Sequence, residues 1–173
     1  EAKQADTDRA FAETEVLFKE KVDNAVITSQ WSQVITAWKA LNSAVGSGSI
    51  DAKQSFERHT ALIAELLSVL DLLNDHFGLS LDPEAYTYHL ISAANVHLPQ
   101  LTESLGRARA LGTGFLTKQA IAPEERPMLA ALTGEVERVF SEMVRSFDKS
   151  LAENDGFKAS LSDHLQAGKG AVV

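Results

Sequence analysis

The chain has 173 residues, of which 45% are hydrophobic and 23% are charged, and a formal net charge of −8. This composition is typical of a globular protein, and the length is sufficient for one well-packed domain. The acidic balance excludes nucleic acid as a partner, because no basic stripe is present to neutralise phosphates. The sequence contains no cysteine, which excludes disulfides and thiolate metal sites.

The first expected helix spans residues 6–44. Its apolar residues, from Phe11 to Val45, recur at spacings of mostly three and four, which is the pattern of one buried stripe. The segment Gly46-Ser47-Gly48-Ser49 ends it as a flexible turn. Asp51 is placed to cap a second helix over residues 51–77, which Gly78 ends.

The third expected helix spans residues 83–117. Asp82-Pro83-Glu84 is a strong start signal, because it combines a side-chain cap with proline at the first helical position. A break over 118–123 leads to a fourth helix over 123–155, and residues 159–167 are also helix-like. Four amphipathic helices with short connections predict a single all-α domain over 1–173, an antiparallel up-down four-helix bundle.

The expected helix lengths are unequal. The first and fourth helices are longer than the inner pair, so both overrun the turn at Gly78–Leu81 and bring the chain ends to one end of the bundle. This geometry suits a domain held on two transmembrane helices outside the given chain. No run of 18 apolar residues occurs within it, and neither does a signal peptide. Because the chain opens at Glu1, we expect a cut or processed form.

The motifs that define the common helical and hydrolytic enzymes are absent from the sequence. None of the five histidines lies three residues after a glutamate, which excludes the di-iron bundle motif. The sequence also lacks a phosphate-binding glycine loop, a nucleophile elbow and a zinc-protease motif. We therefore predict a protein that is not an enzyme and uses no metal or cofactor.

A binding site needs only a few polar groups directed between helices. Arg109 flanks the third helix's apolar stripe, and Arg138 and Arg145 share one flank of the fourth, about 10 Å apart. Arginine offers a planar fork of donors that matches a carboxylate. The alternative is that these arginines are bridged to neighbouring glutamates, such as Glu135 and Glu142.

Helix lengths also place several candidate residues at one level of the expected bundle. His59 lies near the second helix's apolar stripe, where a hydrogen-bonded core histidine is the simpler interpretation. Counting residues from the turns places candidate residues from all four helices at about the same height in the bundle. The predicted ligand-binding set is Trp38, Arg58, His59, Thr60, Thr102, Arg109, Arg138 and Arg145.

The stretch from residue 59 to 116 resembles the helical extracytoplasmic sensor regions of proteobacterial methyl-accepting chemotaxis receptors, and of related sensor kinases and diguanylate cyclases. The shared features are the Gly-Leu-x-Leu-Asp-Pro turn from Gly78 to Pro83, Tyr86-x-Tyr88, Leu98-Pro99 and the segment from Leu105 to Arg109. The resemblance implies a periplasmic, ligand-binding domain of an inner-membrane receptor that works as a homodimer or another homo-oligomer.

Known ligands of such sensors include amino acids and organic acids, so the arginines predict a carboxylate such as malate or citrate. A second resemblance, through Arg107-Ala108-Arg109 on a glycine-flanked helix, is to nitrate-sensing helical domains. It would change the ligand to an inorganic anion. A different class stays open, a helical interaction module without a small-molecule ligand.

Overall fold

The computed structural model describes the backbone of residues 2–172, and their side chains except at positions 2, 169, 171 and 172. It contains α1 (Ala2–Lys21), α2 (Ala25–Gly46), α3 (Ala52–His76), α4 (Ala85–Ile91), α5 (Leu98–Lys118), α6 (Glu125–Glu153) and α7 (Asp155–Val172). A 3-10 turn, η1 (Leu79–Leu81), and a π-helical segment, η2 (Ser92–His97), complete it. The described range holds no strand, so the all-α prediction is confirmed.

The chain divides into two compact units between Leu73 and Asn74. Unit 1 contains α1, α2 and nearly all of α3, and unit 2 contains the elements from η1 to α7. The assembly of the long helices into one up-down four-helix bundle stays a prediction.

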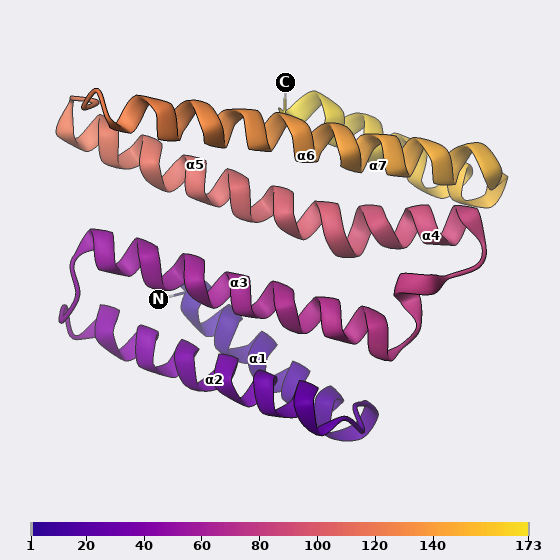
Figure 1. Ribbon diagram of the computed structural model, residues 1–173, viewed down its shortest axis with the longest axis horizontal. Coiled ribbons are helices and arrows are strands. Elements are labelled where there is room, and N and C mark those ends of the chain that lie inside the picture. Colours follow the sequence, from indigo (N-terminus) through magenta and orange to yellow (C-terminus); the bar gives the residue numbers. More distant parts are fainter. Residues whose placement is uncertain (1, 173) are drawn as a thin grey trace. The chain divides into compact units, whose positions relative to one another are not determined.

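In unit 1, α1 and α3 both pack on α2 (Figure 1). The ring of Phe18 stacks on Trp31, and Phe11 lies between Trp31 and Trp38, so α1 runs antiparallel to α2. Gln30 of α2 donates a hydrogen bond to Ser68 of α3. The buried core residues of this unit are Phe18, Ile27, Trp31, Val34, Leu41, Leu62 and Val69.

The first expected helix is wrong in one respect, because the structure breaks 6–44 at residues 22–24. If α1 and α2 formed one straight helix, at about 100° per residue, the apolar face of α1 would point about 160° away from that of α2. A straight helix could not bury both faces against one partner. The chain instead reverses at Asn24, whose side chain accepts hydrogen bonds from the backbone N–H groups of Val26 and Ile27.

The reversal also removes the expected overrun of the first helix. It covers Trp31, which is 6% exposed, with the rings of Phe11 and Phe18 of α1. The ring of Trp31 is therefore buried within unit 1.

In unit 2, α5 and α6 are antiparallel neighbours (Figure 1), with Leu101, Val139 and Met143 buried between them. The expected helix 83–117 is interrupted by η2. Pro99 has no N–H and cannot donate to the carbonyl of Asn95, and Leu98 N–H reaches back to Ala93 O in a π-type bond.

The fourth expected helix is α6, which ends at Glu153, two residues before the expected end. Asn154 then caps α7 by accepting a hydrogen bond from the backbone N–H of Phe157. The helix-like stretch 159–167 lies inside α7, which extends further in both directions.

Candidate functional site

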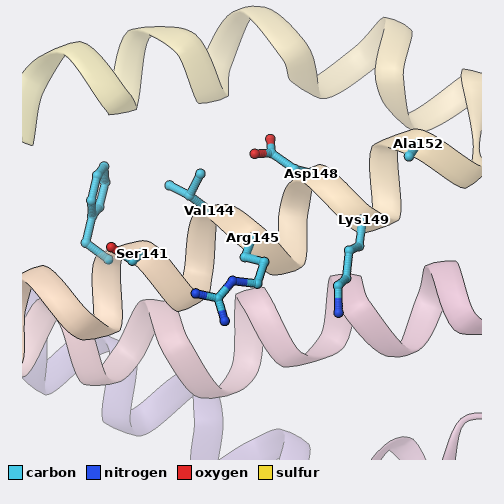
Figure 2. Close-up of a pocket in the computed structure, with 7 residues that line it drawn as sticks. Ser141, Val144, Arg145, Asp148, Lys149 and Ala152 are labelled. Atoms are coloured by element: carbon cyan, nitrogen blue, oxygen red, sulfur yellow. The ribbon is translucent and has the colours of Figure 1, made fainter.

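A hollow of about 640 Å³ lies along α6 in unit 2. It is open to solvent and is lined mostly by apolar atoms. All of its lining residues come from four turns of α6, namely Phe140, Ser141, Val144, Arg145, Asp148, Lys149 and Ala152. Figure 2 shows them along the helix.

Two cations, Arg145 and Lys149, lie one helical turn apart on the same side of α6 (Figure 2). Val144 and Asp148 point to the other side, toward the neighbouring helix α7. No ion pair joins Arg145 or Lys149 to a carboxylate among the described side chains. Counting Asp148, the hollow carries a local charge of +1 in a chain whose net charge is −8. The arrangement can therefore hold a small anion.

Arg138, two turns before Arg145, is already engaged. Its Nη1 lies 2.8 Å from Oε2 of Glu142, and the same carboxylate oxygen lies 3.9 Å from Nδ1 of His97. The glutamate-bridged alternative of the sequence analysis therefore describes Arg138. It does not describe Arg145.

A second polar cluster lies between α5 and α6. Ser104 donates a 3.0 Å hydrogen bond to Glu135 Oε1, and Arg107 Nη1 lies 3.8 Å from Glu135 Oε2. Arg107 Nε and Glu103 Oε1 are buried without a hydrogen-bond partner among the described side chains. Burial raises the pKa of the Glu103 carboxyl, Arg107 opposes the rise, and the carboxylate of Glu135 adds to it. This cluster carries two carboxylates for one guanidinium, so it suits an anion less well than the hollow does.

Two further predicted residues of unit 2 lie on α5. Arg109 is exposed, and Thr102 is exposed and donates a hydrogen bond to the carbonyl of Leu98. In unit 1, Arg58 is exposed and Thr60 is half-buried.

The other two predicted residues of unit 1 have local partners. Nδ1 of His59 lies 2.7 Å from the carbonyl oxygen of Ser55, which fits the simpler interpretation of this histidine. Trp38 Nε1 donates to Asp8 Oδ1. The common level expected for Trp38, Arg58, His59, Thr102 and Arg138 stays a prediction, because these residues are divided between two separate units.

Sequence reasoning missed Lys149 and the Glu103–Arg107–Glu135 cluster. The signal for Lys149 was present, since it follows Arg145 by four residues and so lies on the same helix face. The cluster could not be found in this way. It depends on the register between α5 and α6, which places Ser104 opposite Glu135.

The described structure is thus an all-helical domain with a cationic hollow on one helix. Comparison with protein families shows which class of domain this is: a model of the family for nitrate and nitrite sensing matches residues 1–169. The match spans almost the whole chain, so the chain belongs to the nitrate and nitrite sensing family and is a sensor domain. Neither the comparison with curated proteins nor that with solved structures gives a match.

This family is the one named by the second resemblance, through Arg107-Ala108-Arg109. The match confirms the expected sensor role in signal transduction, but it does not select a chemotaxis receptor among the proteins that could carry such a domain. It also gives no support to malate or citrate as the ligand. Within residues 2–172, no helix is both long and apolar enough to cross a membrane.

Proposed function

We propose that this domain senses nitrate or nitrite by binding the anion in the α6 hollow, between Arg145 and Lys149. The observation that carries the proposal is the family match over residues 1–169. Nitrate and nitrite are small planar anions whose oxygens accept hydrogen bonds in one plane. The guanidinium of Arg145 is a planar fork of donors and suits such an anion.

The electrostatics of the hollow support the same assignment. The chain as a whole repels anions, but at physiological ionic strength charges beyond about 8 Å are largely screened. The charged residues that line the hollow are Arg145, Lys149 and Asp148. Because Asp148 points to the other side of α6, the two cations dominate on their side.

A thermal-shift titration of the 173-residue domain tests the proposal. Sodium nitrate, nitrite and chloride are compared at equal ionic strength, so that general salt effects cancel. We expect nitrate or nitrite to stabilise the domain by an amount that rises with the logarithm of its concentration above the dissociation constant, about 2.7 kcal/mol at 100 times that constant. Chloride should give only the general salt effect. If nitrate and nitrite behave like chloride at every concentration, the proposal is wrong.

An organic carboxylate is the second candidate ligand. The same guanidinium fork binds carboxylates bidentately, and Arg145 belongs to the set that predicted malate or citrate. The titration therefore includes malate, citrate and a set of amino acids. Stabilisation by one of these, with no response to nitrate or nitrite, would assign the site to that ligand class. A domain that responds to none of them would favour a helical interaction module.

We also propose the setting of the domain, a periplasmic region of an inner-membrane receptor that forms a homodimer. The resemblance to chemotaxis receptors and the sensor family both support this setting. A sensor kinase or diguanylate cyclase is the alternative output. Sedimentation at high protein concentration, with and without nitrate, tests the oligomeric state, and a strict monomer under both conditions would contradict it.

A further inference from the structure

Asparagine caps two helix reversals of this chain with nearly the same geometry. Asn24 precedes α2 with φ −147° and ψ 111°, and Asn154 precedes α7 with φ −142° and ψ 104°. Each side chain accepts a hydrogen bond from a backbone N–H of the helix that it begins. Neither connection contains a proline. Both connections could therefore continue as helix. This would lose the asparagine cap and would place asparagine, a poor helix former, inside a helix.

The two reversals differ in the phase of their apolar faces. Across Asn24 the apolar face rotates by about 160°, which makes a straight helix unsuitable. Across Asn154 it rotates by only about 20°. The buried face of α6, with Leu132, Val139, Met143 and Ser150, continues directly into the half-buried apolar residues of α7, which are Phe157, Leu161 and Leu165.

The folded-back helices are also held differently. Three stacked ring pairs and the Trp38–Asp8 hydrogen bond join α1 to α2. The only ring contact that the described side chains give α7 is an edge-to-face pair, between Phe157 and Tyr86 of α4, with centroids 5.8 Å apart. None of the described side chains of α7 is fully buried.

We propose that the α6–α7 junction is a two-state hinge at Asn154, at which α7 either folds back on α6 or continues it as one straight helix. In the folded state the cap on Phe157 N–H and the Tyr86 contact stabilise the reversal. In the straight state these are exchanged for continuous backbone hydrogen bonds through residues 153–157. Straightening also removes α7 from beside the hollow, where Val144 and Asp148 now point toward it (Figure 2).

Pulsed electron–electron double resonance can distinguish the two states by distance. The chain has no cysteine of its own, so introduced cysteines can be labelled specifically. Nitroxides are attached at Ala131→Cys and Asp163→Cys, two exposed positions on α6 and α7. The separation of their Cα atoms is about 48 Å along a straight helix. In the folded state it is about 23 Å, from the difference in height along the two helices and a helix spacing of about 9 Å.

Two substitutions in this labelled protein shift the hinge in opposite directions. Asn154→Ala removes the cap and adds a good helix former, so we expect the ratio of long to short distances to rise about five-fold or more. Asp155→Pro places proline at the first position of α7, where it is tolerated, but proline there clashes with the Leu151 carbonyl in a straight helix. It should give the short distance alone.

Asn24→Ala is the matched control, measured with labels at exposed positions of α1 and α2. It removes the same kind of cap but should not straighten α1, because the faces are out of phase. The hinge is overturned if Asn154→Ala gives the same single short distance as Asp155→Pro. A single long distance in the unsubstituted hinge would overturn it as well. The measurement needs no anion, so its outcome is independent of the proposed function.

Discussion

Trp38 Nε1 donates a 2.7 Å hydrogen bond to Asp8 Oδ1, and the Trp38 ring stacks on Phe11 three residues further along α1. One tryptophan thus joins α1 to α2 by a polar and an aromatic contact. The next ring in the series, Trp31, is stacked by both Phe11 and Phe18. The aromatic series, rather than an amphipathic surface of α1 as a whole, fixes this helix.

We expect Asp8→Ala to lower the free energy of unfolding by about 1 kcal/mol, the usual net value of one hydrogen bond. Phe11→Ala should cost more, about 2 kcal/mol or above, because it removes two stacked pairs. Asp6→Ala is the control, since it breaks only the exposed Arg9–Asp6 pair and should change the stability by less than about 0.5 kcal/mol. Urea denaturation measures all three, and equal losses for Asp6→Ala and Phe11→Ala would contradict the ring-based docking.

The Glu103 carboxyl predicts a pH dependence of stability. Because its pKa is raised in the folded protein, chiefly by burial, the folded state holds this proton more tightly than the unfolded state. The stability it contributes is present below the ordinary value of 4.5 and is lost as the pH rises through the folded pKa.

We therefore expect Glu103→Gln to be more stable than the wild type at pH 7, and the difference to vanish below about pH 4.5. Thermal unfolding between pH 4 and pH 8 measures this, with the exposed Glu137→Gln as the matched control. A Glu103→Gln domain that is less stable than the wild type at pH 7 would show that the electrostatic attraction of Arg107 outweighs burial.

The sequence predicted helix type and most helix ends well, because caps and glycines are local signals. Gly78, at φ 72°, ends the second expected helix two residues after α3, as its left-handed preference suggests. The reversal at Asn24 does not follow from spacings of three and four alone. It follows from the five-residue gap between Val26 and Trp31, across which the apolar stripe moves to another face of a straight helix. The pairing of Arg138 with Glu142 lies within one helix at a spacing of four, and the sequence analysis contains it as an alternative. The contact of Arg107 with Glu135 depends on the register between α5 and α6, which no single-helix pattern contains.

Gln119 is the one non-glycine residue of the described range with a positive φ, 52°, where it ends α5. Gln119→Gly should stabilise the domain by about 0.5–1 kcal/mol. It removes the strain of a residue with a side chain in the left-handed region, and the greater conformational entropy that glycine loses on folding offsets only part of this gain. Gly78→Ala is the converse change. No atom lies within 4 Å of its added Cβ, so the expected loss of about 1 kcal/mol is conformational. Denaturation midpoints that move in the same direction for both would contradict this account.

Arg138 provides an internal comparison for the site. Its guanidinium is engaged by Glu142 at 2.8 Å, so we expect Arg138→Ala to retain the wild-type affinity for nitrate within about two-fold. Arg126→Ala, an exposed arginine at the start of α6, is the matched control away from the hollow. Equilibrium dialysis at fixed ionic strength measures both. A loss of ten-fold or more for Arg138→Ala would move the site toward His97 and Glu142.

The most direct measurement is a calorimetric titration of nitrate and nitrite into the wild-type domain, Arg145→Ala and Lys149→Ala, at constant ionic strength. Arg145→Ala should weaken the binding about ten-fold or more, since it removes charge-assisted hydrogen bonds, and Lys149→Ala should weaken it less, because a single ammonium lacks the planar fork. Saturable binding in the wild type that is lost in this order supports the hollow as the sensing site. Wild-type affinity in both variants would contradict it.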